Sequence, residues 1–254
     1  MHPTIDLNAD LGEGFGHSRS SVDEALLDLV SSANIACGFH AGDATTMRDT
    51  VRAAASRGVV IGAHPSYPDI PGFGRRELGL SPKEIRFHVS YQLRAFRDVC
   101  SAENAKFSYV KAHGALYNRA AKDSSAAAAI VQAISDVDPS LVLLGLAESE
   151  MARAAGRSGV AFAGEAFADR AYKSDGSLVP RTEPGAVIHD VQAAVKRAIT
   201  MVRSSTVTAD DGTTVGVVAQ SLCVHGDNPD ALPMLRELRT QLERSGVRIA
   251  PFAS

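Results

Sequence analysis

The sequence predicts an α/β protein that folds as a (β/α) barrel of seven or eight units. Short apolar segments alternate with longer amphipathic ones along all 254 residues, an order typical of parallel strands joined by helical crossovers. One such barrel takes about 250 residues, and no linker-like change of composition divides the chain. We therefore expect a single domain over residues 1–254, with a closed barrel favoured over an open sheet.

Eight segments have the length and apolar content of buried strands. They are Thr4–Asp10, Ala33–Phe39, Val59–Ala63, Phe107–His113, Leu141–Leu146, Val160–Gly164, Val215–His225 and Val247–Pro251. Amphipathic helices are expected between them, and Ser81–Glu84 forms a capping box that begins one of these helices. Ala166–Val187 is polar and contains two prolines, so we expect a long loop near the functional end of the barrel.

Composition excludes several classes of function. A net charge of −3 gives no electrostatic reason to expect nucleic acid, because phosphate binding requires a basic face. No apolar run reaches the roughly 18 residues of a membrane span, and the first residues lack the basic and apolar regions of a signal peptide. Cys37, Cys100 and Cys223 are odd in number and far apart, as expected for free thiols in the cytoplasm.

The first predicted strand carries an acidic stripe. Side chains alternate between the two faces of a strand, so Asp6, Asn8 and Asp10 share one face and apolar residues share the other. The apolar face packs under helices, which leaves the polar face for the barrel interior. Buried carboxylates are costly without partners, so this stripe indicates a site that contains a metal, hydrogen-bond partners or water.

Other strands end in ionisable residues as well. Functional groups of parallel barrels lie at the C-terminal ends of the strands, and several such groups follow predicted strands here. They are His40, His64, Lys111, His113, Glu165, His225 and Asp227. A single histidine at a strand end is more often structural, but its repetition on four strands favours a shared site.

Two kinds of chemistry fit these residues. Asp10, His40 and His64 could supply the oxygen and imidazole ligands of a divalent metal with open positions for water. Metal-free acid–base catalysis by pairs such as His225 and Asp227 is the alternative. Neither a GxxxxGK[ST] motif nor a strand-linked GxGxxG motif is present. The basic glycine-rich segment Gly72–Arg76 could bind an anion, with Arg75 as the preferred ligand, although such a segment is more often only a flexible loop between a strand and a helix.

Seven segments resemble motifs of the LamB/YcsF family, to which the A subunit of 5-oxoprolinase belongs. They are IDLNADLGE at 5–13, SANIACGFHAGD at 32–43, GAHPSYPD at 62–69, GFGRR at 72–76, VKAHGALYN at 110–118, EAFADR at 165–170 and CVHGD at 223–227. The resemblance covers nearly the whole chain in the right order, and only residues 204–214 look less typical of the family.

The resemblance implies a distorted TIM-like barrel related to those of metal-dependent deacetylases. It also implies ring opening of 5-oxo-L-proline to L-glutamate, coupled to ATP hydrolysis, in a complex with subunits B and C. Opening a five-membered lactam is unfavourable, and phosphorylation of the lactam oxygen would create a leaving group that water can displace. Which subunit binds ATP, whether a metal is bound and whether the chain forms a homo-oligomer stay open.

On this hypothesis the residues take specific roles by their chemistry. The catalytic set is Asp10, His40, His64, Lys111, His113, His225 and Asp227; the substrate-binding set is Asp6, Asn8, Asn34, Arg75 and Glu165. Two alternatives remain: a stand-alone metal-dependent amidohydrolase or deacetylase, and a protein that binds the substrate without catalysing a reaction. The density of ionisable groups favours an enzyme.

Overall fold

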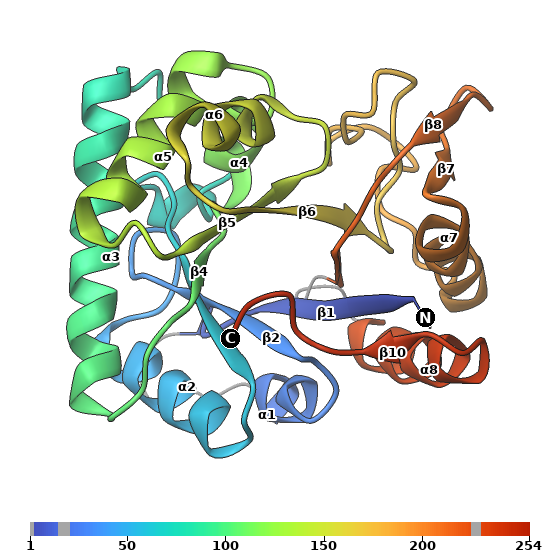
Figure 1. Cartoon of the computed structure of the whole chain (residues 1–254), viewed down its shortest axis with the longest axis horizontal. Helices are drawn as coiled ribbons and strands as arrows, with labels where there is room; N and C mark the ends of the chain where they lie inside the picture. Colours follow the sequence, from blue (N-terminus) through green and yellow to red (C-terminus); the bar gives the residue numbers. More distant parts are fainter. Residues whose placement is uncertain (1–2, 15–20, 225–229) are drawn as a thin grey trace.

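Seven parallel strands form a closed barrel in the computed structural model, which describes residues 3–14, 21–224 and 230–254 (Figure 1). The strands are β1 (Thr4–Leu11), β2 (Ser32–Ala36), β3 (Val60–His64), β4 (Tyr109–Val110), β5 (Val142–Leu146), β6 (Phe162–Phe167) and β9 (Ser221–Cys223). Each strand up to β6 pairs with the next, and β9 pairs with both β6 and β1. This double pairing closes the ring and confirms the predicted barrel.

The outer layer consists of helices that pack on the apolar faces of the strands. They are α1 (Ser21–Leu27), α2 (Ala44–Ser56), α3 (Pro82–Ala102), α4 (Gly114–Ala120), α5 (Ser124–Val137), α6 (Glu150–Ser158), α7 (Val191–Ser204) and α8 (Ala231–Arg244). A short 3₁₀ helix, η1 (Ile70–Gly72), precedes α3. The predicted capping box begins α3, since Ser81 and Glu84 each accept the other's backbone N–H.

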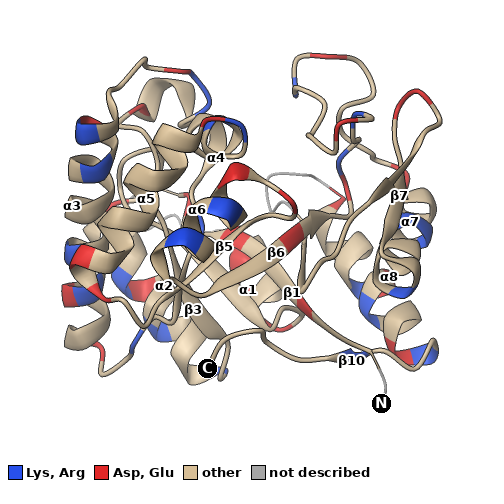
Figure 2. Ribbon diagram, turned by 45° about the horizontal axis from the view of Figure 1, so that its top comes forward, with Lys and Arg blue, Asp and Glu red and all other residues tan. Residues whose placement is uncertain are grey.

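Charged residues of both signs lie on the outer helices (Figure 2). Several pairs connect neighbouring helices at their exposed faces. Arg86 of α3 contacts Asp136 of α5 at 2.6 Å, and Arg52 of α2 contacts Glu103 at the end of α3 at 2.8 Å. Such exposed pairs contribute little stability each, so burial of the apolar helix faces is the main stabilising interaction of this layer. No helix of the described residues has the length and apolar character needed to cross a membrane.

The predicted strand Phe107–His113 is reduced to the two residues of β4, and two other predicted strands also differ from the structure. Val215–His225 is divided: β8 (Thr214–Gly216) forms an antiparallel hairpin with β7 (Thr206–Thr208) outside the barrel, and β9 begins only at Ser221. The apolar residues of this segment continue across the gap between β8 and β9, so the sequence does not reveal it. Val218 lies in this gap and is 61% exposed. Val247–Pro251 forms only the two-residue β10 (Arg248–Ile249), which pairs with the start of β1. The ring therefore contains seven strands.

The N-terminal end of the barrel is filled by an aromatic plug. The ring of Tyr109 lies inside the barrel with Leu144 and Ala163. The ring of Phe252 packs against it, with the two ring centroids 5.0 Å apart. A Cβ atom at Gly62 would lie 2.2 Å from the Tyr109 ring, so glycine is required at this position of β3. The cavity with the strand-end histidines His64 and His113 lies at the opposite, C-terminal end of the barrel.

Candidate active site

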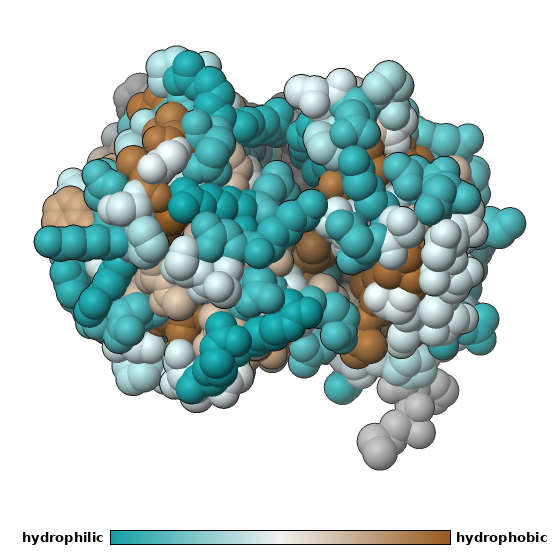
Figure 3. Space-filling view, turned by 90° about the horizontal axis from the view of Figure 1, so that it is seen from above, coloured by the Kyte–Doolittle hydropathy of each residue, from teal (hydrophilic) through white to brown (hydrophobic). Residues whose placement is uncertain are grey.

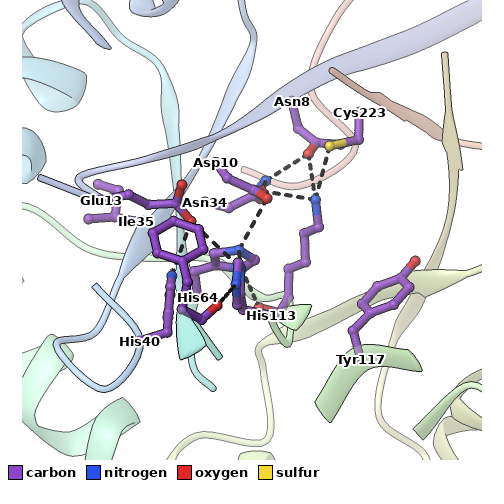
Figure 4. A network of polar contacts seen from close by, with 12 residues as sticks. Asn8, Asp10, Glu13, Asn34, Ile35, His40, His64, His113, Tyr117 and Cys223 are labelled. Carbon is purple, nitrogen blue, oxygen red and sulfur yellow. Dashed lines mark hydrogen bonds and ion pairs between the residues drawn. The ribbon is translucent and has the colours of Figure 1, made fainter. Parts of the chain in front are cut away.

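A cluster of one glutamate and three histidines lies at the C-terminal ends of the first four strands (Figure 4). Glu13 follows β1, His40 follows β2, His64 is the last residue of β3, and His113 lies between β4 and α4. One ligand atom from each of the four residues lies within 4.8 Å of the others. The three histidines are buried, and the rings of His40 and His113 stack at 3.8 Å with an interplanar angle of 7°.

Backbone carbonyls fix the tautomers of two of these histidines. Nδ1 of His64 lies 2.7 Å from the carbonyl oxygen of Lys111, and Nε2 of His113 lies 2.9 Å from that of Phe73. A carbonyl oxygen only accepts, so both of these nitrogens carry a proton. The other two, Nε2 of His64 and Nδ1 of His113, face each other at 3.0 Å. Metal-ligating histidines usually have this arrangement, with the second nitrogen donating to a carbonyl.

Burial keeps His40 and His113 neutral. Desolvation, together with the neighbouring His64, lowers the pKa of His40 well below its usual value. Desolvation also lowers the pKa of His113 well below that value, with contributions from His40 and His64. Neutral imidazole is the form that binds metals. Nε2 of His40 lies 3.1 Å from Glu13, and its buried Nδ1 has no hydrogen-bond partner among the described residues.

The donor set of this cluster fits a divalent transition-metal ion. Three imidazoles and one carboxylate are ligands typical of Zn²⁺ and related ions, whereas Ca²⁺ and Mg²⁺ prefer oxygen ligands alone. The cluster differs in part from the predicted metal set. It contains His40 and His64, and it adds Glu13 and His113. Asp10 of the predicted set lies beside the cluster, with Oδ2 3.3 Å from Nε2 of His64.

Asp10 is held in place by two donors on its other oxygen. Its Oδ1 accepts hydrogen bonds from Asn34 Nδ2 at 2.8 Å and from Lys111 Nζ at 3.1 Å. Asn34 is itself fixed, because it donates to Asn8 and accepts from the Tyr109 hydroxyl, both at 2.7 Å. One oxygen of Asp10 is thus bound by the barrel interior, and the other is directed toward the histidines.

Lys111 is a buried cation between two carboxylates. Its Nζ lies 2.8 Å from Glu165 and 3.1 Å from Asp10, and it also contacts Asn8 and Cys223 at 3.2 Å. Burial acts to lower the pKa of Lys111, but the nearby negative charges outweigh it and raise the pKa well above its usual value. Burial raises the pKa of the Cys223 thiol well above its ordinary value. The thiol is therefore neutral, and the carboxylates are the charge partners of Lys111.

A cavity of about 330 Å³ opens beside this network. Asp10, His64, Lys111 and His113 form part of its wall, Arg75 forms another, and the long loop after β6 supplies Arg170 and Arg181. Figure 3 shows the molecule from above, hollowed between the part that contains α4–α6 and the part that contains α7 and the β7–β8 hairpin. The predicted loop begins later than expected, because Ala166 and Phe167 belong to β6, but it does border the cavity.

The structure brings most of the predicted site residues together. Asp10, His40, His64, Lys111 and His113 form one connected network, and Asn8, Asn34 and Glu165 are bonded to it. Arg75 lies on the cavity, with its guanidinium 4.9 Å from the centre of the Phe73 ring. Asp6 lies deeper in the barrel and accepts hydrogen bonds from the hydroxyls of Ser31, Ser32 and Ser221. His225 and Asp227 lie outside the described residues.

Four residues at this site were not predicted from the sequence. They are Glu13, Tyr117, Arg170 and Arg181. Glu13, Tyr117 and Arg170 lie within motifs that were recognised, so their presence in those segments was an available signal. The hydroxyl of Tyr117 donates to Glu165 at 2.9 Å. Arg181 lies in the long loop outside these motifs, and only the fold shows that it faces the cavity.

Solved structures identify the class of barrel. A T48 deacetylase superposes with a TM-score of 0.50 at 13% identity, over 98% of this chain and 88% of that one. A family 4 carbohydrate esterase from Streptomyces lividans superposes with a TM-score of 0.50 at 12% identity, over 97% and 91% of the two chains. At this level of identity the likeness concerns the fold alone, and the fold is the deacetylase type of (β/α) barrel.

The family follows from closer matches. The model of the LamB/YcsF family matches residues 5–254, so the chain belongs to this family. The 5-oxoprolinase A subunit of Bordetella parapertussis is 52% identical over 98% of this chain and 99% of its own length; that of Streptomyces avermitilis is 50% identical over 98% and 100%. A lactam utilization protein from Thermus thermophilus superposes with a TM-score of 0.91 at 42% identity, over 98% and 100% of the two chains. The resemblance seen in the motifs is confirmed.

Proposed function

We propose that this chain acts as the A subunit of a 5-oxoprolinase, a hydrolase that opens 5-oxo-L-proline to L-glutamate with hydrolysis of ATP to ADP and phosphate. One observation carries the proposal. A polar cavity lined by Asp10, His64, Lys111 and Arg75 lies in a chain about half identical, over 98% of its length, to relatives named as the A subunit of 5-oxoprolinase. The cavity has the acid–base and cationic groups that a small anionic lactam requires.

The reaction needs water to add to the lactam carbonyl carbon, the ring C–N bond to break and the nitrogen to take up a proton. We assign Asp10 as the base that receives the proton of the attacking water. Lys111 and Asn34 hold Oδ1 of Asp10, and Oδ2 lies 3.3 Å from Nε2 of His64 on the cavity wall. In the predicted relay, His225 and Asp227 would deliver a proton to the leaving nitrogen.

Glu13, His40, His64 and His113 are the residues that would hold a divalent metal ion. Such an ion acts as a Lewis acid toward a carbonyl group. His64 and His113 direct Nε2 and Nδ1 toward each other within the cluster, since carbonyl oxygens hold their opposite ring nitrogens. Asn8, Asn34 and Glu165 keep Lys111 and Asp10 in place, and Arg75 binds an anionic group near the histidines.

Metal content tests this assignment without reference to turnover. We expect protein purified with Zn²⁺ to retain one ion per chain by elemental analysis, and His64→Ala to lose it. His88→Ala is the control, because His88 lies in α3 outside the cluster. Equal metal content in wild type and His64→Ala, or no retained metal, would leave metal-free acid–base catalysis as the mechanism.

The partners and location of the chain are part of the same proposal. The word "subunit" in the names of the relatives supports a multi-subunit enzyme, with subunits B and C as partners and ATP bound at the level of the complex. The three cysteines of the described structure are free and buried, which accords with a reducing cytoplasm. We propose no interaction with nucleic acid or membrane, and we leave homo-oligomerisation open.

One alternative is favoured by a specific observation. The cluster of Glu13 and three histidines also suits a stand-alone metal-dependent amidohydrolase or deacetylase that needs neither ATP nor partners. A protein that only binds the substrate would have no use for a buried carboxylate directed at a histidine cluster.

Glutamate release from 5-oxoproline separates these hypotheses. We expect ATP-dependent release when the chain is mixed with subunits B and C, and none from the chain alone. Metal-dependent hydrolysis of a small amide by the chain alone would favour the amidohydrolase. Turnover by the complex that survives Asp10→Asn would favour the role of substrate binding alone. No turnover in the mixture of folded proteins would reject the 5-oxoprolinase.

A further inference from the structure

Arg170 is a buried cation on the wall of the cavity, and the mechanism above does not use it. Its side chain is only 4% exposed, and it follows β6 at the start of the long loop. Its Nε donates to the carbonyl of Ala186 at 3.2 Å, and its Nη2 donates to that of Val179 at 2.5 Å. These two bonds fix the guanidinium against the loop and leave Nη1 and the second hydrogen of Nη2 for another acceptor.

The charge of Arg170 has no ion-pair partner among the described residues. Desolvation lowers the pKa of Arg170 to about 10, with a further contribution from Arg181, while Asp169 acts in the opposite direction. Taking an unpaired cation out of water is expensive. A buried guanidinium beside two other arginines of the same cavity is therefore an arrangement that a bound anion would stabilise.

Arg75 and Arg170 reach the cavity from different segments of the chain. Arg75 lies over Phe73, whose ring contacts both His40 and His113, so it is next to the histidine cluster. Arg170 belongs to the loop that also supplies Leu178 and Arg181 to the cavity. An anionic lactam with its carbonyl at the histidines would extend its carboxylate away from them, which favours the loop arginine as its ligand.

We infer that Arg170 binds the carboxylate of the substrate through the free end of its guanidinium and so selects carboxylate-bearing lactams. Two parallel N–H···O bonds to one carboxylate are the geometry in which arginine binds most specifically. The assignment rests on the proposed function for the identity of the ring. On this assignment Arg75 stabilises the negative charge that develops at the reacting carbonyl.

The test compares two ligands that differ only in the carboxylate. Binding of 5-oxo-L-proline and of 2-pyrrolidinone, the same ring without a carboxylate, is measured by calorimetry on the full chain with subunits B and C. We expect Arg170→Gln to weaken 5-oxoproline binding at least thirtyfold and to leave 2-pyrrolidinone binding within threefold. In turnover, the KM for 5-oxoproline should rise by a similar factor with kcat within threefold, and Arg170→Lys should recover only part of the loss.

Arg197→Gln is the matched control for loop structure. Arg197 donates to the backbone carbonyls of Arg170 and Thr208, so it supports the same loop, but it does not line the cavity. Equal weakening of both ligands by Arg170→Gln, the same loss in Arg197→Gln, or unchanged 5-oxoproline affinity would overturn the inference. So would a wild type that does not bind 5-oxoproline. A wild type that binds 5-oxoproline through Arg170 but forms no glutamate would instead reject the proposed function and keep the carboxylate site.

Discussion

Asp6 and Asp10 lie on the same inner face of β1, but the two carboxylates have different surroundings. Asp6 accepts hydrogen bonds from three neutral hydroxyls, those of Ser31, Ser32 and Ser221. Asp10 forms an ion pair with the ammonium of Lys111 and lies beside His64. One residue type on one strand thus has neutral partners at the closed end of the barrel and charged partners at the open end, where we propose that it acts as a base.

The largest effect should come from removing the carboxylate at the open end. Asp10→Asn keeps the shape but removes the base, so we expect kcat for glutamate release by the complex to fall by about 10²–10⁴. Asp98→Asn, on the exposed face of α3, is the control. A loss of threefold or less, roughly 0.7 kcal/mol of barrier, would show that the two ends of β1 do not differ in function.

Lys111 is expected to link the open end to the stability of the fold. Lys111→Met leaves Asp10 and Glu165 buried without their cation, and breaking such a pair costs about 3–5 kcal/mol. Denaturant unfolding should therefore show a loss of this size, whereas Lys106→Met at an exposed position should change little. Equal stability of the two variants would mean that the charge of Lys111 is not needed by its carboxylate partners.

Substitution of Asp6, at the closed end of the barrel, should give the smallest effect of the three. Its effect on the free energy of unfolding should depend on pH. Burial raises the pKa of Asp6 to about 6 from 3.8, although the three hydroxyls act to lower it. The folded state holds this proton more tightly than the unfolded state, so protonation of Asp6 stabilises the fold. This contribution to the free energy of unfolding is fully present below pH about 4 and is lost as the pH rises through about 6.

Asp6→Asn removes this titration and serves as the reference for it. The free energy of unfolding of wild type minus that of Asp6→Asn should fall by about 1.5 kcal/mol between pH 5 and pH 8. Denaturant unfolding at the two pH values measures this difference, because the other titrating groups cancel. A difference that stays constant or rises with pH would show that the Asp6 pKa is not raised.

Much of the barrel was predictable because the pattern of β1 is unambiguous. Alternation of Ile5, Leu7 and Ala9 with polar residues fixed which face points inward, and the structure confirms it. The same reasoning placed Lys111 and the histidines at one end of the barrel. Parallel strands put equivalent ends together, so their meeting follows from topology.

The remainder of the site depends on contacts that no local pattern reveals. The tautomers of His64 and His113 are set by the carbonyls of Lys111 and Phe73, and backbone groups are the same in every sequence. Glu13 joins the cluster beyond the end of β1, where the alternation of a strand no longer applies. Arg170 faces the cavity only because its loop folds back, with Arg170 bridged to Val187.

The pairing of β1 with β9 has a consequence for synthesis of the protein. Asp6 and Ser221 are partners separated by 215 residues, so a ribosome adding about 5–20 residues per second leaves β1 without β9 for on the order of ten to forty seconds. During that interval the inner face of β1 is open to water, which solvates carboxylates well. An acidic inner face thus suits a strand that must wait for its neighbour, since an apolar one would be prone to aggregation.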